Sequence, residues 1–428
     1  MIKTSSILFF LIILSVFTAL RNISPLYYLL IFSLIIILLL KSKIPNLVIN
    51  RNFGASLGFF LIFIFITFYT IIWSGIYWSS WQFLAGVPRI LLMLIFVFLL
   101  ISYFNNENQF IYVLKILLFC YVIAGLTIFY QIYFGQISWF SQSAGRAGMV
   151  RYSSILGSLT IYGSIVGYGF LLATSETLNM KNNIVKFLII IILFLGSIFC
   201  LSKSAIGMFF LSTIIYLLFY MGSIFKYLKK INKNILILLP IFLLIFILLN
   251  NSFISSYYNA SVTHLLGANN LISNSDNVLL DSPSISLKII TDRLFYWINA
   301  MLNFYGTSAL FTGVGLQGAG GTLGLYGGGS YGTYGVITEY ATAHNAFGDL
   351  LFIGGFLYLI SFICLLISVQ YILLKNYYSP ICKIFFLMNI IFIANMCFAS
   401  GSIFHPAISF PFWLSVSYII KINMNNIK

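Results

Sequence analysis

The sequence predicts an all-α integral membrane protein. Of its 428 residues, 61% are hydrophobic and only 7% are charged, whereas soluble domains carry about 25% charged residues. Nearly uninterrupted apolar runs recur along the chain, for example Tyr27–Leu40, Phe187–Phe199 and Ile235–Leu249. A helix needs roughly 20 such residues to cross a bilayer, and its backbone must satisfy its own hydrogen bonds there.

Apolar segments that fit this prediction follow one another from the N-terminus. The first comes after Met1-Ile2-Lys3 and resembles a signal peptide, but no small-residue cleavage site is evident, so we expect a retained span. The expected spans lie near residues 5–21, 25–41, 54–74, 85–103, 110–132, 156–174, 185–202, 205–225, 234–250, 346–374, 383–400 and 404–421. They divide the chain into nine spans over 1–250, a loop over 251–345 and three spans over 346–428.

The basic residues predict the orientation of these spans. If the N-terminus lies inside, most of the 22 lysines and arginines fall at inner span ends, as at Lys181, Lys226 and Lys229. This distribution follows the positive-inside rule, and both termini are then cytoplasmic. The net charge of +15 is scattered between spans, so we do not interpret it as a nucleic-acid surface.

Two long loops are expected on the outer side, over about 133–155 and 251–345. Loops of this length are usually functional or disordered. The second contains four of the seven acidic residues and, at 287–298, a segment that favours an amphipathic helix on the outer surface.

Several basic residues on the outer side are candidates for binding phosphate, because outer loops are normally poor in them. Arginine grips phosphate with a planar fork, and an ionisable group near a span end is a functional candidate. Lipid-headgroup contact is an equal alternative for Arg21 and Lys288. The stronger candidates are Arg89, Arg146, Arg151, Lys203 and Arg293.

His344 is the candidate for proton transfer. It ends the long outer loop directly before an apolar span, and the unperturbed pKa of histidine, about 6.5, lies close to neutrality. A helix cap or an interfacial residue is the alternative interpretation. His405 precedes Pro406 and favours a turn cap, whereas His264 lies in an Asn-rich stretch that assigns it no role.

Other site classes find little support in the sequence. The glycine-rich run Gly315–Gly329 lacks the GKS/GKT ending of a phosphate loop, and one hypothesis is a mobile loop whose tyrosines stack on sugar rings. The five cysteines lie in or beside apolar spans without a CxxC pattern, so we expect small buried hydrophobic residues. No close carboxylate pair and no Cys/His cluster is present. No metal or other cofactor is expected, although a magnesium site built from acids stays open.

Three motifs resemble the O-antigen ligase/polymerase superfamily of bacterial envelope glycosyltransferases. His344-Asn345, followed after nine residues by Gly355, resembles that family's His-Asn signature. Asp292–Trp297, which leads to Gly313-Val314-Gly315, resembles its Arg-x-x-x-Trp stretch ahead of a Gly-x-Gly. Leu201–Gly207 resembles its Ser-Arg stretch, with Lys203 in place of the arginine. Arg146 and Gly157 also match the Arg-x10-Gly element of O-antigen polymerases, which is a weak pattern.

The resemblance implies an enzyme of the bacterial inner membrane with a GT-C-like architecture and a periplasmic active site. Its substrate would be an oligosaccharide on undecaprenyl diphosphate, and membrane lipids, a chain-length regulator and a flippase of the same pathway would be its partners. His344 and Arg293 would be catalytic. The substrate would be bound by Arg89, Arg146, Arg151, Lys203, Trp297 and Asn345.

Two reactions fit the resemblance, and one other class remains open. A polymerase joins lipid-linked repeat units, whereas a ligase transfers the polymer to lipid A–core, and we favour the polymerase. A lipid-linked oligosaccharide flippase is the rival, but it predicts repeated halves, mid-span charges and short outer loops. A haem-handling protein would need paired histidines, and three histidines are too few.

Overall fold

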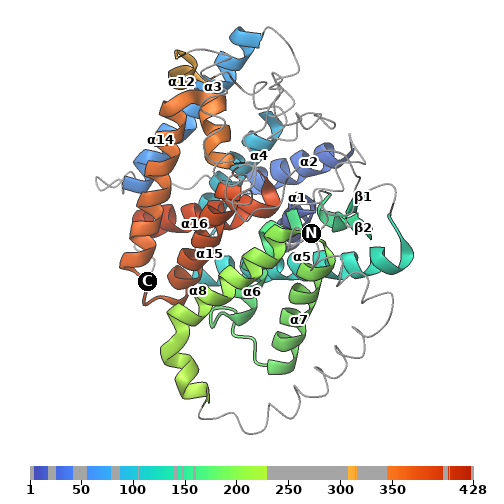
Figure 1. The fold of residues 1–428 in the computed structure, drawn as a ribbon. Coiled ribbons are helices and arrows are strands. Elements are labelled where there is room, and N and C mark those ends of the chain that lie inside the picture. Colours follow the sequence, from blue (N-terminus) through green and yellow to red (C-terminus); the bar gives the residue numbers. More distant parts are fainter. Residues whose placement is uncertain are drawn as a thin grey trace. The chain divides into compact units, whose positions relative to one another are not determined.

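The computed structural model is mainly helical over the residues that it describes (Figure 1). The described residues are 4–17, 26–41, 55–78, 87–104, 106–137, 143–146, 149–157, 161–228, 307–313, 315, 345–398, 403 and 405–425. Every expected span except the one near 234–250 coincides with a helix. That span, the expected amphipathic helix at 287–298 and most of the loop over 251–345 lie outside the described residues.

Four segments within the described residues are long and apolar enough to cross a membrane. They are Ser56–Trp73 of α3 (Ala55–Trp78), Glu107–Phe134, which is α5, Ile353–Lys375 of α14 (Ala346–Lys375) and Pro380–Cys397 of α15 (Pro380–Phe398). Shorter apolar helices or helix segments accompany them: α1 (Thr4–Val16), α2 (Leu26–Lys41), α4 (Val87–Tyr103), α6 (Ile161–Thr174), α7 (Asn183–Phe199), α8 (Lys203–Leu228) and α16 (Pro406–Asn425). These apolar helices support a multi-pass membrane protein.

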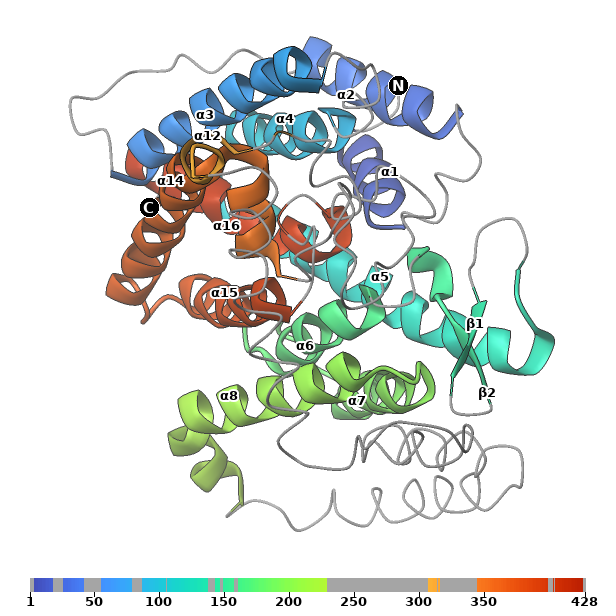
Figure 2. The same cartoon turned by 45° about the horizontal axis from the view of Figure 1, so that its top comes forward.

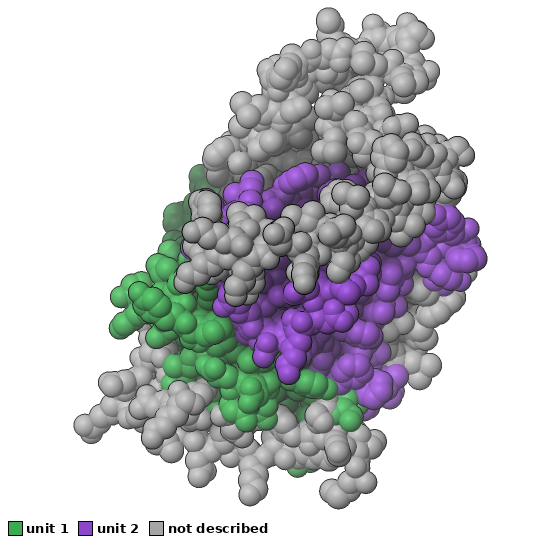
Figure 3. Space-filling view, turned by 90° about the horizontal axis from the view of Figure 1, so that it is seen from below, with its two compact units in different colours: residues 1–8, 34–113, 280–428 green, residues 9–33, 114–279 purple. Residues whose placement is uncertain are grey.

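The chain divides into two compact units, which Figure 3 colours separately. The first unit comprises residues 1–8, 34–113 and 280–428, and the second comprises 9–33 and 114–279.

Aromatic packing builds the core of the first unit. Here α3 packs along α14, α4 packs along α16, and α15 contacts both α14 and α16. The ring of Phe63 stacks on Tyr358 with centroids 5.1 Å apart, and Phe392 stacks on Phe412 at 4.8 Å. Stacked aromatic pairs stabilise a core beyond the area they bury, so these contacts fix α3 and α15 against their neighbours.

Buried polar groups add directional contacts between the helices of the first unit. Asn389 of α15 donates from Nδ2 to Gln370 Oε1 of α14 at 3.3 Å and to Ser415 Oγ of α16 at 3.1 Å. Lys421 donates from Nζ to the carbonyl of Ile101, near the end of α4, at 3.1 Å. Hydrogen bonds of this kind hold apolar helices in one register, because hydrophobic burial cannot do so inside a lipid phase.

In the second unit, α6 packs against both α7 and α8 (Figure 2). The approach of α6 to the start of α8 is close, because a Cβ on Gly163 would lie 2.5 Å from Ser204 Oγ and 2.9 Å from the amide nitrogen of Ala205. Tyr162 donates its hydroxyl to the carbonyl of Leu193 in α7 at 3.3 Å. These contacts fix the beginning of α8 relative to α6.

A small antiparallel hairpin follows α5, where the sequence predicted only a loop. Its strands are β1 (Ser143–Arg146) and β2 (Met149–Tyr152), with Ser143 opposite Tyr152. A short 3-10 turn, Ser154–Leu156, then precedes α6. Because this turn ends at Gly157 with a φ of 76°, α6 begins later than the span expected from residue 156.

Candidate functional site

The structure describes five of the eight candidate residues, distributed over both units. His344, Arg293 and Trp297 lie outside the described residues. Asn345 and Arg89 belong to the first unit, and Arg146, Arg151 and Lys203 belong to the second. The two groups are therefore described as separate sites.

Asn345 caps the helix that follows His344. Its Oδ1 accepts hydrogen bonds from the backbone amides of Phe347 at 2.9 Å and Gly348 at 3.4 Å, and the residue is only 3% exposed. Asparagine is among the preferred N-cap residues, because its side chain satisfies amides that lack a partner within the helix. The first residue after His344 is thus fixed at the start of α14.

Asp349 is a buried carboxylate that the sequence analysis did not assign. It lies in the first turn of α14 and is 1% exposed. An acidic side chain is favoured there because the helix N-terminus carries partial positive charge. Its position just after the long loop was a usable signal, although its burial was not visible in the sequence.

The helix α14 is broken at Gly354 and Gly355, where the sequence predicted a continuous span. Gly355 has φ 68° and ψ −168°, a conformation that is essentially restricted to glycine. A Cβ there would overlap the carbonyl of Phe311 and lie 2.8 Å from the amide nitrogen of Thr312. Only a residue without a side chain allows this contact with the end of α12 (Ala309–Thr312).

Gly313 completes the contact from the opposite side. Its φ is 71°, and a Cβ there would overlap the carbonyl of Ile353 and lie 2.5 Å from the amide nitrogen of Gly354. The carbonyl of Gly313 accepts a hydrogen bond from Trp73 Nε1 of α3 at 3.4 Å. The glycine of one motif therefore lies directly against the glycine pair of another, about forty residues away in sequence, and both views of the fold show α12 beside α14 (Figures 1 and 2).

In the second unit, the structure brings Arg151 next to the start of α8. Arg151 is only 5% exposed, and its Nε donates to the carbonyl of Cys200 at 3.0 Å. Cys200 is the C-cap of α7, and Leu201 then turns the chain with a φ of 50° into α8. The side chain of Arg151 is therefore anchored on the backbone of Cys200, three residues before Lys203. Arg151 and Lys203 are both candidates for binding phosphate.

Lys203 and Arg89 share an unusual position, since each stands in the first turn of its helix. Lys203 is the first residue of α8 and Arg89 the third of α4. Cations are electrostatically disfavoured at a helix N-terminus, whereas anions are favoured. In the second unit, an anion bound near the beginning of α8 would compensate the charge of Lys203. Arg146 lies at the turn end of the hairpin, opposite Met149.

Two residues of α5 hold the loop that follows Arg151, and the sequence analysis missed both. Gln131 Oε1 accepts from the backbone amide of Ser154 at 3.1 Å, and Thr127 Oγ1 accepts from that of Ile155 at 3.2 Å. They stand four residues apart and therefore on one face of the helix. That spacing at the outer end of an apolar span was the available signal.

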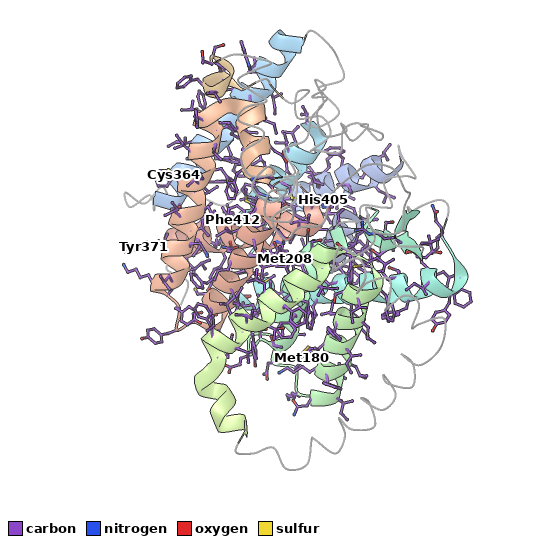
Figure 4. The ribbon with its side chains drawn as sticks, in the orientation of Figure 1. Met180, Met208, Cys364, Tyr371, His405 and Phe412 are labelled. Carbon is purple, nitrogen blue, oxygen red and sulfur yellow. The ribbon has the colours of Figure 1, made fainter. Side chains whose placement is uncertain are left out.

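His405 lies directly before α16 (Figure 4). Its carbonyl accepts from the backbone amides of Ile408 at 2.9 Å and Ser409 at 2.8 Å. Its backbone therefore begins the helix, in line with the turn expected at this histidine. Within the residues that the structure describes, no group of three or more His, Cys, Asp or Glu residues is placed to hold a metal ion.

Comparison with known proteins finds no family model and no curated protein that matches this chain.

Proposed function

We propose that the protein is a polymerase that joins undecaprenyl-diphosphate-linked oligosaccharide repeat units at the periplasmic face of a bacterial inner membrane. The observation that carries this proposal is the close packing of residues 311–313 against residues 353–355, in the first third of α14. The start of α14 directly follows His344-Asn345. The glycine positions of two motifs that resemble the O-antigen ligase/polymerase superfamily thus lie in contact, which supports the proposal that the two motifs serve one site.

The proposed membrane architecture is GT-C-like, with the twelve spans expected from the sequence. Both termini are cytoplasmic, and the loop over 251–345 is periplasmic. The apolar helices support the spans, and the excess of lysine at the expected inner ends supports the orientation. Asn345 then lies at the outer end of α14 and Arg151 in the outer hairpin between α5 and α6, on the side where the lipid-linked sugar is presented.

In the proposed reaction, a sugar hydroxyl of the acceptor attacks the anomeric carbon of the donor. The new carbon–oxygen bond forms as the bond from that carbon to the diphosphate breaks, and the electron pair leaves with undecaprenyl diphosphate. His344 accepts the hydroxyl proton. General-base help of this kind contributes about 10²–10⁴-fold to the rate.

Fixed positive charge meets the negative charge that develops on the leaving diphosphate. Arg151 is suited to this role because it is buried and its Nε is held by the carbonyl of Cys200. A pre-oriented cation in a site of low dielectric stabilises developing charge more than a mobile one in water. Lys203 and Arg146, which belong to the same unit as Arg151, are proposed to add positive charge. The resemblance assigns Arg89 and Trp297 to substrate binding and Arg293 to catalysis.

The decisive experiment is His344→Ala in a deletion strain, with His264→Ala in the same loop as the matched control. We expect His344→Ala to abolish the surface polysaccharide ladder while the protein level on an immunoblot stays unchanged, and His264→Ala to keep the ladder. Arg293→Ala should also abolish it. A normal ladder from His344→Ala would exclude the proposed role of this histidine.

The same gel separates the polymerase from the ligase, which is the second candidate because the motifs are shared by both. In a clean deletion strain, a polymerase defect leaves a single repeat attached to lipid A–core. A ligase defect leaves no attached repeat, and lipid-linked polymer accumulates in the inner membrane. A flippase defect would instead leave lipid-linked single units on the cytoplasmic side.

A further inference from the structure

Gln131 carries a buried polar group that the fold of the second unit uses only in part. The side chain is 0% exposed, and its Oε1 accepts the amide of Ser154 at 3.1 Å. Its Nε2 is buried and has no hydrogen-bond partner within the described part of the chain. Burying a hydrogen-bond donor without a partner costs free energy, because the donor gives up its hydrogen bonds to water. Buried donors are therefore normally paired, and we expect an acceptor at this position.

The orientation of the Gln131 amide is fixed by its neighbour. The backbone amide of Ser154 is a donor, so the carboxamide oxygen must face it and the NH₂ group must face away. Ser154 itself has a φ of 57° and follows Ser153 in a right-handed conformation. Successive right- and left-handed residues form a concave array of amides that binds anions in many proteins. Here two of those amides, of Ser154 and Ile155, donate hydrogen bonds to the side-chain oxygens of Gln131 and Thr127.

Two buried groups at this loop, the Arg151 guanidinium and the Gln131 NH₂, are hydrogen-bond donors. Arg151 lies two residues before Ser153, is almost fully buried, and is anchored through Nε on the carbonyl of Cys200. Ser153 and Ser154 are buried as well. The Arg151 guanidinium lies in the segment 151–154, and Ser154 of that segment orients the Gln131 NH₂ group. Two such donors favour a ligand with several acceptor oxygens, and a phosphate group is such a ligand.

We propose that Gln131 is a substrate-binding residue, whose Oε1 holds the Ser154 loop while its Nε2 donates to an oxygen of the lipid diphosphate bound by Arg151. This inference rests on the proposed function, because it assumes the same diphosphate substrate. It assigns a binding role to the end of α5, which none of the sequence motifs covers.

The test uses the full-length protein in nanodiscs and undecaprenyl diphosphate as the probe, with undecaprenol as the lipid control. Gln131→Glu keeps an oxygen for Ser154 but removes the donor and adds negative charge. We expect its Kd for undecaprenyl diphosphate to rise by at least about tenfold, which corresponds to about 1.4 kcal/mol. The matched control is Gln370→Glu in the other unit, where the amide already has partners on both sides; its Kd should stay within about twofold of the wild type.

A second variant keeps the test decisive if Gln131→Glu fails to fold. Gln131→Met has a similar length and removes both polar atoms, so its Kd should rise to a similar extent. Wild-type affinity in a folded Gln131→Glu or Gln131→Met protein overturns the binding role alone. A wild-type protein that does not distinguish undecaprenyl diphosphate from undecaprenol overturns the proposed function together with this inference.

Discussion

At the scale of the residue, the contact between the end of α12 and the break in α14 depends on the absence of a side chain at Gly313 and at Gly355. Both residues have positive φ, and each would place a Cβ onto backbone of the other segment. Backbone atoms cannot move aside as the end of a flexible side chain can. These two positions should therefore tolerate substitution less than glycines that lie within straight helices.

We predict that Gly355→Ala lowers the free energy of unfolding by more than about 2 kcal/mol, because it adds backbone strain to a steric overlap. Gly58 in α3 is the matched control, since a Cβ there would meet nothing within 4 Å. Gly58→Ala should leave stability unchanged or raise it by up to about 1 kcal/mol, because alanine favours a helix. Thermal unfolding of the two purified variants in detergent measures the difference. Equal melting temperatures would contradict the packing of α12 on α14.

The sequence predicted some of these residues and missed others for identifiable reasons. Arg151 and Lys203 were recognised because a basic residue near an outer span end is unusual. The structure anchors the Arg151 side chain on the carbonyl of Cys200, three residues before Lys203. Gln131 was missed because its partner, Ser154, lies 23 residues away and its importance depends on a positive φ. The spacing of Gln131 and Thr127 on one helix face could be seen in the sequence, but their burial and the backbone angles of the loop could not.

At the scale of the element, the helices were the most predictable part of the fold. Their apolar runs are long and uniform, so their existence follows from composition alone. Departures occur where a few backbone angles decide the outcome: α14 breaks at Gly354-Gly355, and α6 starts only after the turn at Gly157. The hairpin over Ser143–Tyr152 has strands of only four residues, too short for an alternating pattern to reveal.

Two helices begin with the same asparagine cap, which allows structural and functional roles to be separated. Asn182 accepts from Ile184 and Val185 at 2.9 and 3.4 Å, the same distances that Asn345 makes with Phe347 and Gly348. We predict that Asn182→Ala and Asn345→Ala each lose about 1 kcal/mol of stability. Only Asn345→Ala should, in addition, shorten the polysaccharide ladder, because Asn345 adjoins His344. Comparable ladders from the two variants would leave Asn345 with a capping role alone.

At the scale of the whole molecule, the distribution of charge predicts the orientation that the proposed function requires. A periplasmic reaction needs the C-terminal end of α5 and the start of α14 outside, and the segment between α14 and α15 inside. Two exposed residues represent these sides: Gln136 follows α5, and Tyr378 lies between α14 and α15. Single cysteines at these positions, in a protein whose five native cysteines are replaced by alanine, report the side directly.

In intact cells whose outer membrane has been permeabilised, a membrane-impermeant maleimide should label Gln136→Cys and leave Tyr378→Cys unlabelled until the inner membrane is opened. The physical reason is that lysines are retained on the cytoplasmic side during insertion, and Lys375 and Lys383 flank Tyr378. The opposite labelling pattern would place the start of α14 in the cytoplasm. His344 would then face no periplasmic substrate, and the proposed polymerase would be excluded whatever the packing of its motifs.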